Sequence, residues 1–131
     1  MEIVNPPDLG RPRGFAHGVI APSGSRLLYV AGQTAADDQG HIGEPEFVAQ
    51  FDAALHKVVQ VVRAAGGEAK LIARMTVYVT DLDAYRVSRP LLREVWTTRM
   101  GTHYPAMALV QVAGLVDQGA TVEIQADAVL P

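Results

Sequence analysis

One apolar stripe constrains the fold of this chain more than any other feature of its sequence. Its members recur at helical spacing and therefore share one side of a helix. They are Phe47, Phe51, Ala54, Leu55, Val58, Val62 and Ala65. The polar residues expected on the opposite side are Gln50, Lys57, Gln60 and Arg63. Pro45 before the stripe and Gly66 and Gly67 after it are typical of a helix start and a helix end.

Segments rich in β-branched and aromatic residues predict the strands. They cover residues 16–20, 26–31, 71–80, 106–112 and 120–129. The turn sequence APSGS separates the first two, which predicts a hairpin between them. The last segment alternates, so that Val122 and Ile124 point to one face of a sheet and Glu123 and Gln125 to the other.

A second helix is expected over residues 84–99, with Asp83 as its N-cap. Pro90 lies inside this segment and should bend the helix or delay its start. Residues 1–14 contain three of the eight prolines and are expected to form an extended arm. The element order is therefore ββαβαββ, an α+β fold in one domain over residues 1–131, with both helices on one face of the sheet.

The segment 106–112 is apolar on both faces, yet two helices can cover only one face of a sheet of four or five strands. A second copy of the chain is the simplest cover for the other face. We therefore expect a symmetric homo-oligomer with sheets facing one another, whose clefts draw residues from two chains.

Composition removes several classes of function. The chain has no cysteine, which excludes disulfides, thiolate nucleophiles and cysteine-ligated metals. Its net charge of −3 gives no basic surface for nucleic acid, and no apolar run is long enough to span a bilayer. The four histidines lack zinc-site spacing, so no metal is expected. We expect a cytoplasmic protein that acts on a small molecule.

Several motifs together resemble one known family over residues 15–129. They are RLLYVAGQTA (26–35), DDQG (37–40), MTVYVTDLDAY (75–85), YPA (104–106) and VEIQADAV (122–129). The set is similar to the Rid family, the YjgF-like enamine/imine deaminases. The resemblance implies a chorismate-mutase-like fold, a homotrimer with three clefts at the subunit boundaries, and no metal or organic cofactor. The implied reaction hydrolyses reactive enamines and imines to a carbonyl compound and ammonia.

The resemblance also implies the site residues, with four departures from the family pattern. Met107 occupies the position of the arginine that binds the substrate carboxylate, and Leu109 that of a frequent cysteine. Phe15 stands where a tyrosine is usual, and Arg89 where an asparagine is usual. We expect these four residues to bind a less polar substrate, with Arg89 as a possible anchor for an anion.

The implied catalytic residue, Glu123, is retained in the last strand. In the family this glutamate holds the water that attacks the imine carbon, and Gly32 offers its backbone carbonyl to the same region. Plainer interpretations also exist: Glu123 could simply face solvent, Met107 could fill the core, and Arg89 could be a solvated helix residue.

Two functions therefore remain open on the sequence. One is a cofactor-independent deaminase with an altered substrate pocket, in which Glu123 positions the attacking water. The other is a trimeric binding protein for a small metabolite that has lost hydrolysis, which the absence of an arginine at Met107 favours. An older label for the family, ribonuclease, fits poorly with a pI of 5.7.

Overall fold

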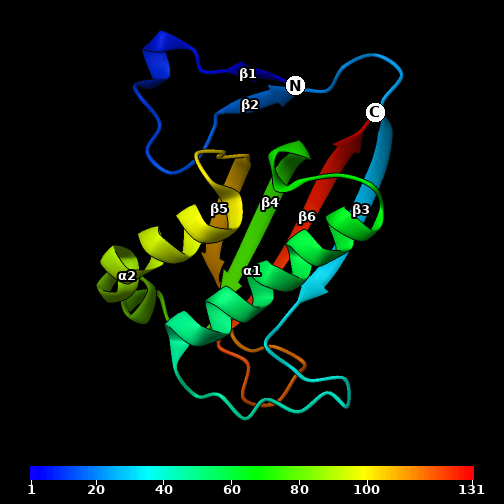
Figure 1. The fold of residues 1–131 in the computed structure, drawn as a ribbon. Coiled ribbons are helices and arrows are strands. Elements are labelled where there is room, and N and C mark those ends of the chain that lie inside the picture. The colour runs from blue at the N-terminus through cyan, green and yellow to red at the C-terminus, as the bar shows by residue number, and fades with distance from the viewer.

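The computed structural model describes residues 1–131 and contains a four-stranded mixed sheet with two helices on one face (Figure 1). The strands are β3 (Arg26–Gln33), β4 (Ile72–Val79), β5 (Ala106–Gln111) and β6 (Val122–Leu130), in the order β3-β6-β4-β5. β4 and β5 run parallel, and the other neighbours are antiparallel. The α+β class and the placement of both helices on one face are confirmed.

Helix α1 (Phe47–Ala64) crosses one face of the sheet (Figure 1) and buries the predicted stripe. Glu46 caps its start, since its carboxylate accepts hydrogen bonds from the backbone N–H groups of Val48 (3.1 Å) and Ala49 (2.8 Å). The residues of the stripe from Phe51 to Val62 are buried between helix and sheet. Their burial is the main apolar contact that holds this layer in place.

Gln50 contradicts the expected polar side of α1, because its side chain is 0% exposed. Its amide nitrogen donates to the carbonyls of Glu44 (2.7 Å) and Gly119 (3.0 Å), and its oxygen accepts from the N–H of Thr121 (2.9 Å). Two loops therefore cover this end of the helix and satisfy a buried amide. Periodicity alone could not indicate that cover.

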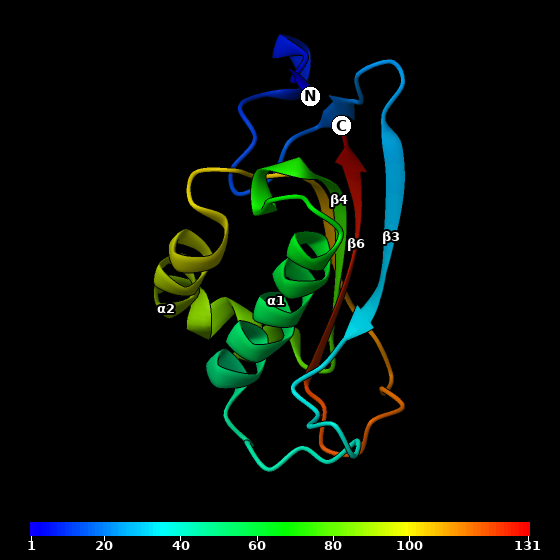
Figure 2. The ribbon, with the colours of Figure 1, turned by 45° about the vertical axis from the view of Figure 1, so that its right-hand side comes forward.

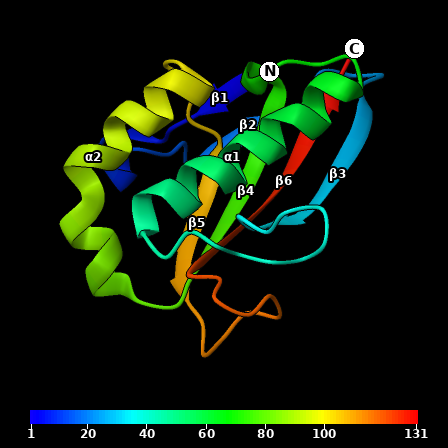
Figure 3. The ribbon, with the colours of Figure 1, turned by 60° about the horizontal axis from the view of Figure 1, so that its bottom comes forward.

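Helix α2 (Leu82–Met100) begins earlier than predicted. Its N-cap is Asp81, not Asp83, because the Asp81 carboxylate accepts from the N–H groups of Asp83 (2.9 Å) and Ala84 (3.2 Å). Pro90 lies within the helix and does not delay its start. Figure 3 shows that the helix bends along its length, as expected for an interior proline.

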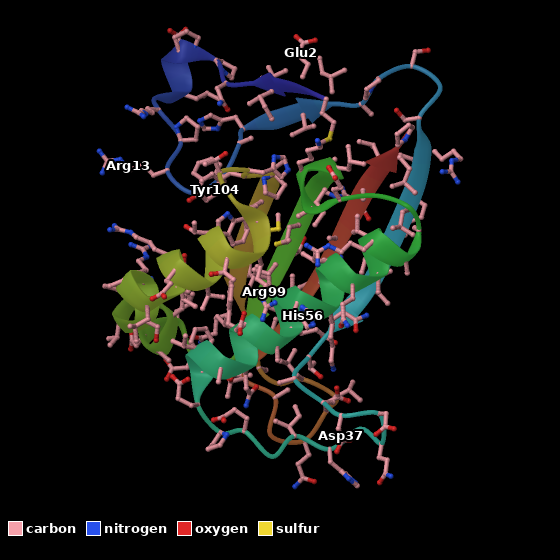
Figure 4. All side chains as sticks on the ribbon, in the orientation of Figure 1. Glu2, Arg13, Asp37, His56, Arg99 and Tyr104 are labelled. Atoms are coloured by element: carbon pink, nitrogen blue, oxygen red, sulfur yellow. The ribbon has the colours of Figure 1, made fainter.

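An ion pair joins the two helices. Arg99 on α2 donates from Nε and Nη2 to the two carboxylate oxygens of Asp52 on α1, at 2.8 and 3.2 Å. These hydrogen bonds raise the pKa of Arg99. A third donation, from Nη1, reaches Nδ1 of His56 at 3.0 Å, and Figure 4 shows the two residues side by side. Because arginine only donates, His56 must accept at Nδ1.

The N-terminal segment differs from both expectations made for it. β1 (Glu2–Val4) pairs with β2 (Gly18–Ile20) in a separate two-stranded sheet, with Ile3 opposite Val19. The segment is therefore not simply an extended arm, and β2 does not form the predicted hairpin with β3. The strand partner of β2 comes from the first residues of the chain instead, while β3 pairs with β6.

The face of the sheet opposite the helices is uncovered (Figure 2). It carries large apolar side chains in solvent, with Tyr29 71%, Leu27 59% and Val110 41% exposed. The chain therefore does not supply a second cover for its own sheet, as the layer count predicted. Neither helix is long and apolar enough to cross a membrane.

Candidate functional site

The structure divides the predicted site residues between the two faces of the sheet. Strand register decides the division, because residues paired across neighbouring strands share a face. Met107 pairs with Met75, and Leu109 with Val77, both of which are fully buried under the helices. Glu123 pairs with Tyr78, which lies between the buried Val77 and Val79 in β4 and therefore points to the uncovered face.

On the helix side, a cavity of about 560 Å³ lies between α2 and β5. Its apolar floor is formed by Phe51, Val77, Leu92, Met107 and Leu109. Met107 and Leu109 are half-buried and pack against the core. Met107 therefore both contacts the core and lines the cavity. A volume of this size is typical of small-molecule sites.

Two stacked aromatic rings form one wall of the cavity. The rings of Trp96 and Tyr104 lie 5.4 Å apart and nearly parallel, at 5°. Trp96 Nε1 donates to the carbonyl of His103 at 3.0 Å, and the ring of His103 lies 2.7 Å from the carbonyl of Ile72. These contacts fix the wall to α2 and to the start of β4. Figure 4 shows Tyr104 between the N-terminal segment and α2.

Arg89 lines the same cavity, together with two arginines that sequence reasoning missed, Arg13 and Arg93. The guanidinium of Arg89 lies over the ring of Tyr85, 5.3 Å from its centre. Arg93 is four residues after Arg89 in α2, and this spacing places both on one side of the helix. The sequence therefore contains a signal for Arg93 once Arg89 is a candidate. Arg13 had no such signal, because its position depends on the path of the N-terminal segment.

Phe15 follows Gly14, which lines the cavity, but is not itself among the lining residues. Its ring packs edge-on against His17, with the centres 5.1 Å apart. Ala16, the next residue, donates its N–H to the carbonyl of Pro105 at 2.9 Å and fixes this segment beside β5. Phe15 therefore adjoins the cavity without forming its surface.

On the uncovered face, Glu123 lies against Gly32. A β-carbon at position 32 would lie 2.9 Å from Cδ and Oε1 of Glu123. Gly32 occupies an irregular stretch of β3, where the register shifts between Val30 and Gln33. Such irregularities re-aim strands near functional sites, and the missing side chain here leaves room for the carboxylate. The expected neighbourhood of Glu123 and Gly32 is thus present.

Gly32→Ala should therefore impair the site without impairing the fold. The new methyl group would displace the end of a flexible side chain, so the free energy of unfolding should change by less than about 1 kcal/mol. The displaced carboxylate should lower the rate of any reaction that uses Glu123 by about 10- to 100-fold. Gly43→Ala is the matched control, because nothing lies within 4 Å of a β-carbon there. Equal activity of the two variants in an imine-hydrolysis assay would contradict the role assigned to this contact.

The family profile described as Endoribonuclease L-PSP matches residues 12–130. The chain therefore belongs to the Rid family, also called the YjgF family. Among solved structures, YyfB from Yersinia pestis, a Rid-family protein of unknown function, is 27% identical with a TM-score of 0.82 and 98% of each chain covered.

Two proteins from E. coli are also similar. TdcF, solved with bound serine, is 30% identical with a TM-score of 0.70, over 93% of this chain and 92% of its own. The YjgF gene product is 27% identical with a TM-score of 0.69, over 95% and 92%. No curated protein sequence is significantly similar to this chain.

Proposed function

We propose that the chain is a hydrolase of reactive enamines and imines, and that its active sites form between neighbouring copies in a homotrimer. One observation carries this proposal. Glu123 and the cavity lined by Met107 lie on opposite faces of one sheet. Within one chain they cannot meet the same substrate, whereas the carboxylate of one copy can lie at the cavity of the next.

The uncovered face of the sheet supports association. Tyr29 and Leu27 on β3 and Val110 on β5 expose apolar surface on the face that carries Glu123. Large apolar side chains exposed on one uncovered sheet face are typical of a protein interface. The serine bound in TdcF supports a ligand related to an amino acid.

The proposed reaction needs only groups that the chain possesses and water. Glu123 accepts a proton from a water molecule while the water oxygen bonds to the carbon of the protonated imine, and the C=N π electrons move to nitrogen. The proton then passes to that nitrogen, and as the C–N bond breaks Glu123 takes the hydroxyl proton of the carbinolamine, so that the carbonyl forms and ammonia leaves. Glu123 finally returns this proton to solvent. Imine and water are thus converted to a carbonyl compound and ammonia. A positioned carboxylate contributes about 10²- to 10⁴-fold to such proton transfers.

The proposed function is tested by generating imino acids in situ, in the assay mixture itself. An amino-acid oxidase converts alanine to 2-iminopropionate and phenylalanine to its imino acid, and the loss of imine is followed with and without the protein. We expect acceleration in proportion to protein concentration. If no imino acid is hydrolysed faster than in buffer, the hydrolase proposal is wrong.

Met107→Arg should increase activity on 2-iminopropionate. A guanidinium at the floor of the cavity could bind the carboxylate of this small substrate through charge-assisted hydrogen bonds, which corresponds to a gain of about 10- to 100-fold in kcat/KM. Met107→Gln is the control, because it adds polarity without charge. An unchanged kcat/KM in the arginine variant would show that the pocket has diverged at more than this position.

A binding function is the alternative, and Met107 is the residue that favours it. Without an arginine there, the cavity lacks the carboxylate anchor that the family resemblance implies. A binding protein would retain ligand affinity after Glu123→Gln and would show no imine hydrolysis at all. The same assay therefore separates the two functions.

A further inference from the structure

We propose that the cavity binds an anion with an aromatic or long apolar tail, whose carboxylate is held at the rim by Arg13, Arg89 and Arg93. The proposal rests on the proposed function and names its substrate class: imino acids with bulky apolar side chains. It also names a replacement, at a different position, for the charge that Met107 lacks.

The charge around the cavity is opposite to that of the whole chain. The chain contains 11 basic and 14 acidic residues, with a net charge of −3. Three of the arginines line this one cavity, and no aspartate or glutamate does. The cavity therefore carries a local positive potential that would attract an anion.

The three guanidinium groups have no carboxylate partner. The ion pairs of the structure join Lys70 to Glu68, Arg74 to Asp127, Arg86 to Asp83 and Arg99 to Asp52. Arg13, Arg89 and Arg93 are absent from all of them. Arg89 lies over the Tyr85 ring instead. Their donors are therefore available to a ligand, and a planar guanidinium matches a carboxylate in a bidentate geometry.

The interior of the cavity indicates what the rest of the ligand must be. Below the rim, the surface is formed by apolar and aromatic side chains such as Phe51, Trp96, Met107 and Leu109. A small polar ligand would leave this surface in contact with water. A phenyl or longer alkyl group would fill it and gain apolar burial.

This orientation also suits hydrolysis. In an α-imino acid the imine carbon is bonded directly to the carboxylate carbon. A carboxylate at the rim therefore keeps the reacting carbon near the mouth of the cavity, while the side chain enters the interior. The mouth is where Glu123 of a neighbouring copy can approach. The same orientation therefore explains both the specificity for bulky side chains and the access of the Glu123 carboxylate to the imine carbon.

Binding can be measured with stable probes that are not hydrolysed. We would titrate the protein with acetate, 3-phenylpropionate and the uncharged 3-phenylpropionamide by isothermal calorimetry. Trp96 is the only tryptophan and lines the cavity, so its fluorescence reports whether binding occurs there. We expect 3-phenylpropionate to bind at least about tenfold more tightly than either of the other probes, as for charge-assisted hydrogen bonds combined with apolar burial.

The double variant Arg89→Gln, Arg93→Gln should lower the affinity for 3-phenylpropionate at least about tenfold. Its affinity for 3-phenylpropionamide should equal that of the wild type. The control is Arg63→Gln, because Arg63 is exposed on α1 and does not line the cavity. Equal affinity for acid and amide, no measurable binding of any probe, or an unaffected double variant would overturn the proposal. Selective acid binding without imine hydrolysis would overturn the proposed function alone, and hydrolysis without selective acid binding would overturn this inference alone.

Discussion

Replacing Glu123 by glutamine should slow imine hydrolysis by about 10²- to 10⁴-fold. Glutamine has nearly the same size and can still accept a hydrogen bond from water, but it cannot take the proton of that water at neutral pH. The side chain is half-buried against Gly32 and opposite Tyr78, so the substitution should leave its surroundings intact. The measurement is kcat/KM for the imino acids of phenylalanine and alanine.

The control for this variant is Glu94→Gln. Glu94 is exposed on α2 and is in none of the ion pairs. The Glu94→Gln substitution removes the same negative charge at a distance from the proposed site. If Glu123→Gln retains the rate of Glu94→Gln while both unfold at the wild-type temperature, the catalytic role of Glu123 is refuted.

Tyr29→Asp should separate the copies and abolish activity. Tyr29 is the most exposed side chain among the apolar residues of the open face, and it pairs across the strands with Asp127. Because Arg74 already pairs with Asp127, a new carboxylate at position 29 would be an unpaired charge on the surface proposed to be buried, which costs about 2 to 5 kcal/mol at an interface. With the copies apart, no cavity would have a Glu123 beside it, so the rate should fall at least about 100-fold.

Sedimentation velocity measures the state of assembly directly. The mass obtained for the wild type should be about three times the chain mass of 14.0 kDa. The mass obtained for Tyr29→Asp should equal that of a single chain. Val87→Asp is the matched control, since Val87 is 82% exposed on α2, away from the open sheet face. An active monomer, in either the wild type or Tyr29→Asp, would refute the shared site.

The sequence was sufficient for the parts of the fold that depend on local pattern. The stripe of α1 and the alternation of the last strand each have a period that identifies the element and its buried side. Two aspartates that are two residues apart, Asp81 and Asp83, are equally suitable caps by residue type, so the start of α2 could not be assigned locally. The partner of β2 depends on tertiary contacts between segments that are separated in the sequence, and no short-range pattern encodes that choice.

The residues of the candidate site also divide into those that a local pattern can place and those that only the tertiary structure places. Alternation correctly placed Glu123 on the face opposite Val122 and Ile124. Strand β5 is apolar on both faces, so the face of Met107 became clear only from its register with Met75. Arg93 could have been inferred from its helical spacing to Arg89. Arg13 could not, because tertiary structure alone places the N-terminal segment at the cavity.

The shared site is tested most directly by mixing two inactive variants. Glu123→Gln lacks the carboxylate, and Met107→Trp should fill the floor of the cavity. If each site draws on two copies, mixed trimers contain sites with a normal carboxylate from one variant and a normal cavity from the other.

Every cyclic trimer that contains both chains should then have about one functional interface in three, because a normal cavity meets a normal carboxylate only once around the ring. The measurement is the rate of imine hydrolysis by co-expressed, doubly tagged trimers purified through both tags. Recovery of activity well above either variant alone is the predicted result. No recovery in trimers shown to contain both chains would contradict the account.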